Sequence, residues 1–159
     1  LAGVLFNQRA GTDILHIPYK GTGPALNDLL GGQVAMSFTD VLTAAPHIKA
    51  GKLRALGVTT AERSRILPDV RTVMEQGVPD YDVSVFFGIV APAGTPPEGV
   101  QRLNTAFASA LKQPEVRQRL EEQGLEIAAD QRPEQLGRFI GAEVAKWREV
   151  VKASGARAD

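Results

Sequence analysis

The feature that most limits how this chain can fold is a regular alternation in its N-terminal part. Short apolar runs occur at residues 14–18, 33–38 and 53–60, and amphipathic stretches at about 24–30 and 41–50 separate them. Runs of that length suit buried strands, and the apolar spacing between them suits helices. Strand, helix, strand, helix, strand is the order of a parallel sheet covered by helices, so the sequence predicts an α/β fold.

The second half of the chain has a different pattern. Residues 82–91 are rich in β-branched and aromatic residues and form the strongest strand prediction in the chain. The segment Pro92–Pro97 then interrupts regular structure, because it holds three prolines and a glycine. Beyond it, apolar residues at helical spacing predict three helices, over Val100 to Leu111, Val116 to Leu120 and Leu136 to Val151.

These patterns divide the chain into an α/β part, residues 1–85, and a crossover strand with helices, residues 86–159. The three helices have apolar faces to cover, yet the only strand-like stretch among them is 125–128. A second copy of the chain is one candidate cover, and polypeptide that precedes Leu1 is another. The chain opens with residues typical of the body of a helix, without a methionine or a signal peptide. We therefore expect preceding sequence to be absent from it.

Composition argues against several classes of function. Lysine plus arginine equals aspartate plus glutamate, 18 against 18, which disfavours a nucleic-acid binder because such proteins need a basic face. There is no cysteine, and His16 and His47 lack metal-ligand spacing, so we expect no disulfide and no metal site. No apolar run reaches the ~20 residues of a membrane helix. Motifs for a nucleophile or a phosphate loop are absent from the sequence, so we expect neither an enzyme nor a cofactor.

The most informative segment is a glycine-rich turn between the first predicted strand and helix. Its residues are Tyr19, Lys20, Gly21, Thr22, Gly23 and Pro24. We place Pro24 at the first helical position, where the missing N–H costs nothing. Free N–H groups at the helix start, close approach at the two glycines, the Thr22 hydroxyl and the Lys20 charge would together favour a carboxylate. The alternative is that the glycines only make a tight turn.

Three further residues are candidates for the same site. Thr39 and Asp40 end the second predicted strand, at the same edge of the predicted sheet, where Asp40 could accept a hydrogen bond from a ligand. The alternative role of Asp40 is to cap the helix that follows. Phe86 and Phe87 are consecutive in a predicted strand and therefore point to opposite faces. We expect one to pack in the core and the other, assigned as Phe87, to line a cleft.

Several stretches of the sequence together match a known family. HIPYKGTGPALNDLLGGQV, PHIKAGKLRALGVTTAERSRILPDVRTVMEQGVPDY, FFGIVAPAGTPPEGVQRLN and the closing GAEVAKWREVVKASG occur in that order. They closely resemble the tripartite tricarboxylate transporter solute-binding family, which includes the Bug proteins. The resemblance implies a type II periplasmic binding protein-like fold, whose two lobes close on a small acid. Members are typically about twice this length, so the chain resembles their C-terminal half.

The resemblance also assigns roles along the chain. Residues 1–85 would form most of the second lobe as a parallel or mixed sheet with helices, and residues 86–159 the crossover strand and helices of an incomplete first lobe. In the family, backbone N–H groups after the "PYKG" turn hold a ligand carboxylate. The family typically has an acid followed by an amide near Asp40, where this chain has Thr39 and Asp40.

The expected function is therefore capture of a small organic acid or acidic amino acid in the periplasm, for membrane transporter subunits. Alone, half of such a receptor should bind its ligand weakly. The alternative is an effector-binding sensor domain of a regulator or signalling receptor, which would use the same fold. An enzyme would need catalytic groups from outside this chain.

Overall fold

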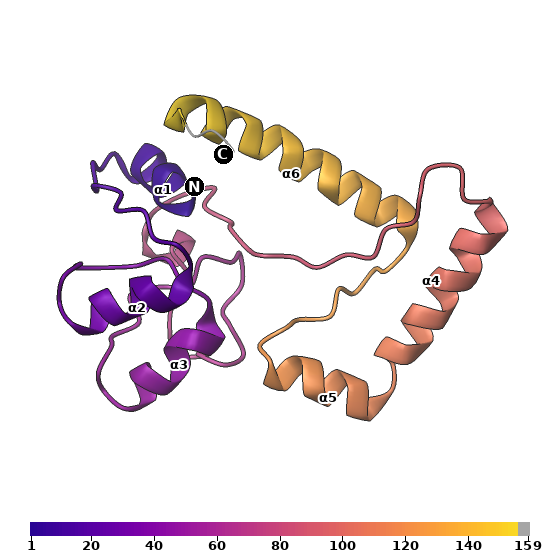
Figure 1. The fold of residues 1–159 in the computed structure, drawn as a ribbon, viewed down its shortest axis with the longest axis horizontal. Helices are drawn as coiled ribbons and strands as arrows, with labels where there is room; N and C mark the ends of the chain where they lie inside the picture. Colours follow the sequence, from indigo (N-terminus) through magenta and orange to yellow (C-terminus); the bar gives the residue numbers. More distant parts are fainter. Residues whose placement is uncertain (156–159) are drawn as a thin grey trace. The chain divides into compact units, whose positions relative to one another are not determined.

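The computed structural model describes residues 1–155, which fall into two compact units that divide between Val85 and Phe86 (Figure 1). The first unit contains helices α1 (Ala2–Ala10), α2 (Thr22–Leu30) and α3 (Val41–Lys49), and the short 3₁₀ helix η1 (Met74–Gln76). The second contains α4 (Pro97–Leu111), α5 (Pro114–Glu122) and α6 (Pro133–Ser154). Assigning these units to two lobes of a receptor stays a prediction.

Helix ends follow the prolines and glycines of the sequence. Each helix of the second unit begins with a proline, whose missing N–H is one of the donors that a first turn leaves unpaired anyway. Helix α1 ends at Gly11, which adopts the left-handed conformation (φ 64°) typical of a C-terminal cap. One expected boundary is wrong: α2 begins at Thr22, so Pro24 occupies the third helical position. A first turn tolerates proline there for the same reason.

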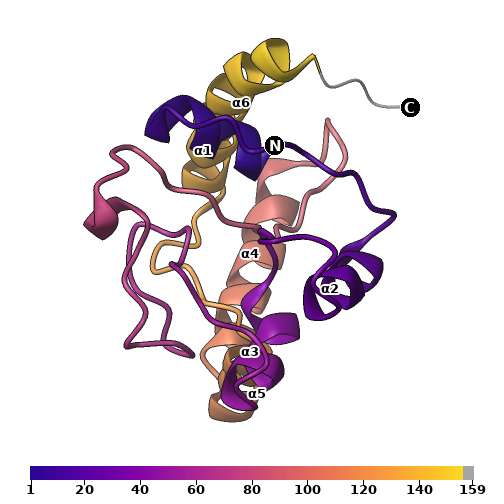
Figure 2. The same cartoon turned by 90° about the vertical axis from the view of Figure 1, so that its left-hand side faces the viewer.

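The predicted strands are wrong for this chain. Among residues 1–155 there is no strand, and one isolated parallel bridge joins Val58 to Thr72. Val58 donates its N–H to the Arg71 carbonyl (3.1 Å) and accepts from the Val73 N–H (2.9 Å). Apolar, β-branched runs favour strands, but a strand forms only where a neighbouring backbone supplies the complementary donors and acceptors. Figures 1 and 2 both show the chain between α1 and α2 as an unpaired, extended stretch.

An aromatic cluster forms the core of the first unit. The Tyr81 ring lies edge-on to Phe6 (centroids 5.7 Å apart, 88°), and Phe38 completes the cluster at 5.8 Å from Phe6. Tyr81 is fully buried, and its hydroxyl donates to the Ala2 carbonyl (3.0 Å). This bond ties the end of the unit to the first turn of α1, across nearly its whole length of chain.

A second anchor holds the stretch that leads from α1 to the turn. The Asn7 amide donates to the Ile14 carbonyl (3.0 Å), and its oxygen accepts from the Ile14 N–H (3.1 Å). The Thr12 hydroxyl donates to the same Asn7 oxygen (2.9 Å). These bonds substitute for the strand pairing that the segment lacks, and they fix the path of the chain toward the glycine-rich turn.

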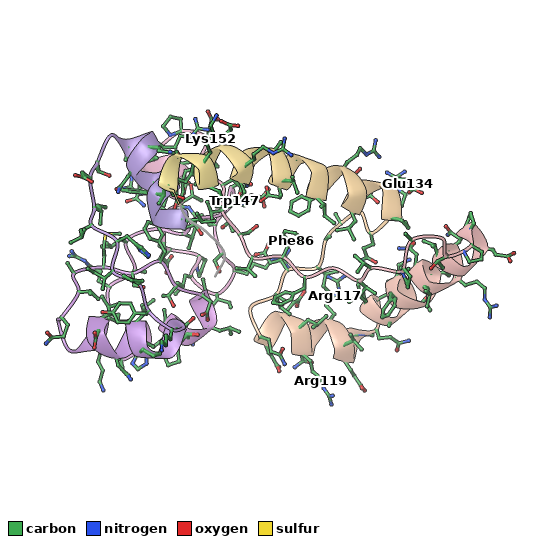
Figure 3. The ribbon with its side chains drawn as sticks, turned by 45° about the horizontal axis from the view of Figure 1, so that its top comes forward. Phe86, Arg117, Arg119, Glu134, Trp147 and Lys152 are labelled. Carbon is green, nitrogen blue, oxygen red and sulfur yellow. The ribbon has the colours of Figure 1, made fainter. Side chains whose placement is uncertain are left out.

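The second unit is organised around α6. The extended segment that opens the unit lies against this helix, since the Phe86 and Phe139 rings meet edge-on with centroids 4.8 Å apart. Figure 3 shows Phe86 on that segment and Trp147 on α6. The Trp147 indole N–H donates to Glu143 Oε2 (2.8 Å), and the tryptophan is half-buried. Neither α4 nor α5 contains a buried residue. None of the described helices is both long and apolar enough to cross a membrane.

The Tyr81 hydroxyl gives a test of the first unit. Burial raises the pKa of Tyr81 from 10.0 to about 12, so the unfolded chain loses this proton first as the pH rises. The stabilisation that the neutral Tyr81 phenol provides is fully present below pH 10 and is lost as the pH rises toward 12. Tyr81→Phe should lower the free energy of unfolding by about 1 kcal/mol at neutral pH, because the Ala2 carbonyl loses its donor.

Tyr81→Phe should also remove the loss of stability that ionisation of Tyr81 causes at alkaline pH. The difference in free energy of unfolding between the wild type and Tyr81→Phe should therefore shrink above pH 10. Urea unfolding of both proteins across that pH range measures the difference. A constant difference at all pH values would contradict the burial of a neutral Tyr81.

Candidate functional site

The glycine-rich turn is tied to the helix that it starts. The Tyr19 hydroxyl donates to Asp28 Oδ2 (2.8 Å), and Asp28 lies on α2, nine positions further along the chain. This hydrogen bond to a carboxylate is the main reason that the pKa of Tyr19 is raised, because the bond holds the phenol proton. Tyr19 therefore serves first as an anchor of the turn. The sequence analysis missed Asp28, whose only signal is its place on the helix that follows.

The start of α2 has no cap from the protein itself. Gly21 is the N-cap residue, with φ 118°, and no side chain accepts a hydrogen bond from the first turn. That φ lies in the region that side chains disfavour, so glycine is required there. The backbone N–H groups of Thr22 and Gly23 have no acceptor among residues 1–155. Two donors at the positive end of a helix dipole are thus left unpaired.

The turn that carries these donors is exposed. A Cβ atom placed on Gly21 or on Gly23 would meet nothing within 4 Å in the described structure. Lys20, Gly21, Thr22 and Gly23 are all exposed. An anion can therefore reach the Thr22 and Gly23 N–H groups, with the Thr22 hydroxyl as a third nearby donor.

The start of α3 is different, because a carboxylate of the chain already occupies it. Asp40 Oδ1 accepts from the Thr43 N–H (2.8 Å) and from the Thr43 hydroxyl, so Asp40 caps α3. Partial burial acts to raise the pKa of Asp40, but the hydrogen bonds from Thr43 outweigh it and lower that pKa. The capping role that the sequence left open is therefore present. Asp40 therefore accepts hydrogen bonds from the first turn of α3 in the way that a carboxylate ligand would accept them from the first turn of α2.

Thr39 and Phe87 are the remaining predicted residues. Next to Asp40, the Thr39 hydroxyl oxygen is buried and has no hydrogen-bond partner among the described residues. Phe87 belongs to the second unit and leaves 79% of its surface exposed, while Phe86 packs on Phe139. A role for Phe87 in lining a cleft stays a prediction. The described residues hold no group of three or more side chains suited to a metal ion.

Two solved structures resemble this one over nearly its whole length. Rpa4515 of R. palustris, solved with adipate, is 37% identical, with a TM-score of 0.79, over 97% of this chain and 51% of its own. MatC of Rhodopseudomonas palustris, with bound malate, is 36% identical, with a TM-score of 0.69, over 94% of this chain and 52% of its own. Such neighbours have the type II periplasmic binding protein-like fold. The chain is therefore similar to about half of a protein of this fold class.

The family itself is also established. Residues 1–156 match the tripartite tricarboxylate transporter family receptor, and the chain belongs to this family. Protein BugT of Bordetella pertussis is 39% identical over 96% of this chain and 47% of BugT. The chain thus spans about half the length of such relatives. The family comprises periplasmic receptors that bind small carboxylates and work with membrane transporter components, and it is not an enzyme family.

The Asp40 cap gives a test of the local geometry. Asp40→Ala should destabilise the first unit by about 1 kcal/mol, because the Thr43 N–H loses its acceptor. Asp40→Asn should cost much less, since an asparagine oxygen caps a helix nearly as well. Thermal unfolding of the two variants measures the difference. Equal losses in both would show that the carboxylate charge, rather than the capping bond, stabilises the start of α3.

Proposed function

We propose that this chain is part of an extracytoplasmic solute-binding protein that captures a small carboxylate for a tripartite tricarboxylate-type transporter. The observation that carries the proposal is the uncapped, exposed start of α2, where the Thr22 and Gly23 N–H groups lack acceptors in the described chain. Membership of a family of carboxylate receptors supports the same conclusion.

The physical argument for a carboxylate rests on charge and donor geometry. The helix dipole alone favours an anion by ~0.3–2 kcal/mol at such a position. Each hydrogen bond from an N–H group to a charged acceptor adds roughly 1.5–3 kcal/mol. A carboxylate has two oxygens and can accept from both N–H groups at once, while the exposed Lys20 adds attraction at longer range.

The ligand class follows from the relatives and from the site together. Adipate and malate, found in the related structures, are both small dicarboxylates. We propose a dicarboxylate or a related organic acid as the ligand. Residues 1–85 would form most of one lobe of the receptor, and residues 86–159 the crossover strand and helices of the other. The chain spans about half of its relatives, so we expect the 159-residue chain to bind weakly by itself.

Substitutions of Gly23 test the contribution of its backbone N–H to binding. Gly23→Pro deletes the N–H at a position of the first helical turn, where proline is tolerated. Gly23→Ala keeps the N–H, and the added Cβ meets nothing within 4 Å, so it is the matched control. Saturation-transfer NMR with adipate detects weak binding. We expect the adipate signal for the wild type and Gly23→Ala, and an affinity about tenfold lower or worse for Gly23→Pro.

Two outcomes would count against the proposal. Equal binding by Gly23→Pro and Gly23→Ala would show that the Gly23 N–H does not hold the ligand. Equal binding of adipate and of its uncharged diamide would show that the site does not select a carboxylate. Circular dichroism of both variants confirms that α2 is intact, so that lost binding is not mistaken for lost structure.

A further inference from the structure

Within the described chain, the glycine-rich turn is held to the rest of the first unit mainly through Tyr19. Residues 15–21 make no backbone hydrogen bond to any described residue. Among residues 11–24, Tyr19 alone is half-buried and the others are exposed. The Tyr19 hydroxyl donates to Asp28 Oδ2 (2.8 Å), and no other side chain of residues 15–24 forms a hydrogen bond in the described structure. The position of the turn therefore depends on this one bond.

The acceptor of the bond is itself fixed. Asp28 lies near the end of α2, and its backbone carbonyl accepts from the Gln33 N–H (2.8 Å) beyond the helix. Leu26 of the same helix is buried, so α2 packs into the interior of the first unit. The bond thus joins an exposed turn to a packed helix. It closes a short loop, residues 20–27, that contains both candidate donors of the site.

A loop with two glycines loses much conformational freedom when it becomes ordered. Glycine populates more backbone conformations than any other residue, so fixing Gly21 and Gly23 has a large entropic cost. If the ligand had to order the turn, its apparent affinity would be reduced to the fraction of molecules in which the donors are already placed. A bond that orders the turn beforehand removes this cost from binding.

The chemistry of the pair fits this role better than direct contact with an anion. Asp28 carries a negative charge on the helix whose start would hold the carboxylate, and that charge would repel a ligand that approached it. A phenol has a single proton to donate, so the Tyr19 hydroxyl that donates to Asp28 cannot also donate to a ligand. Both groups therefore serve the turn.

We propose that Tyr19 is a positioning residue, whose hydrogen bond to Asp28 holds the turn in the conformation that presents the Thr22 and Gly23 N–H groups to a carboxylate. This role rests on the proposed function of the start of α2. Tyr19 acts through the backbone of the turn, and it does not touch the ligand.

Tyr19→Phe tests this role, because it removes the hydroxyl and keeps the ring. Titration of the ¹⁵N-labelled 159-residue chain with adipate, followed by the amide resonances, measures the affinity. We expect Tyr19→Phe to bind adipate about fivefold more weakly than the wild type, because loss of the bond lowers the population of the ordered turn. Tyr81→Phe is the matched control. It removes another tyrosine hydroxyl that donates within the first unit, and it should lower stability without changing the affinity.

Two substitutions of Asp28 separate positioning from direct contact. Asp28→Asn keeps an oxygen that can accept from the Tyr19 hydroxyl, so its affinity for adipate should equal or exceed that of the wild type. Asp28→Ala removes the acceptor and should weaken binding as Tyr19→Phe does. The double variant should bind no more weakly than Tyr19→Phe, because both changes break the same bond. An Asp28→Ala variant that binds as well as the wild type would overturn the role, because a hydroxyl that contacts the ligand directly does not need Asp28.

The order of the turn can also be measured without a ligand. The heteronuclear ¹H–¹⁵N NOE of Thr22 and Gly23 reports backbone motion on the picosecond to nanosecond scale. We expect lower values in Tyr19→Phe than in the wild type and in Asp28→Asn. Unchanged values, or equal adipate affinity of Tyr19→Phe and the wild type, would overturn the positioning role and leave the carboxylate site standing. A wild type that binds no adipate would overturn the proposed function, and this role with it.

Discussion

The candidate site depends on one local constraint, a helix start that the chain does not cap. At the beginning of α2, Gly21 adopts a backbone conformation that only glycine takes easily, and no side chain reaches the first turn. The N–H groups of Thr22 and Gly23 belong to exposed residues and have no acceptors in residues 1–155. An exposed N–H group can donate to water at little cost. At the N-terminus of a helix the dipole also favours an anion as the acceptor in place of water.

The start of α3 shows what the start of α2 lacks. Asp40 places a carboxylate oxygen within hydrogen-bonding distance of the first turn of α3. Burial acts to raise the pKa of Asp40, and the hydrogen bonds to its carboxylate together outweigh burial and lower that pKa. Helix α2 lacks such a residue at its start, and its own carboxylate, Asp28, accepts from the Tyr19 hydroxyl instead. One start is therefore satisfied internally and the other is available. The chain belongs to a family of receptors that bind small carboxylates, and we propose that the available start binds such a ligand.

Much of this could be predicted from the sequence because prolines and glycines act locally. Prolines at the starts of α4 and α6, and Gly11 at the end of α1, mark helix ends through their own dihedral preferences. The candidate site is similarly local, a glycine turn that enters a helix. The strand predictions failed because pairing is not local. Residues 82–91 have strand-forming side chains, but within the described chain their pairing stops at Val83, whose N–H donates to the Thr59 carbonyl (2.8 Å), and residues 84–91 find no backbone partner. The one bridge among residues 1–155 joins Val58 to Thr72. The Tyr19–Asp28 bond depends on a helix orientation that no local pattern encodes.

The most direct test of the central claim observes the two backbone groups themselves. In a ¹⁵N-labelled sample of the chain, titration with malate should move the amide resonances of Thr22 and Gly23 downfield, because a charged acceptor replaces water at each proton. The amide of Thr43, which already donates to Asp40, should stay in place. Large shifts elsewhere with none at Thr22 and Gly23 would contradict the claim that this helix start holds the carboxylate.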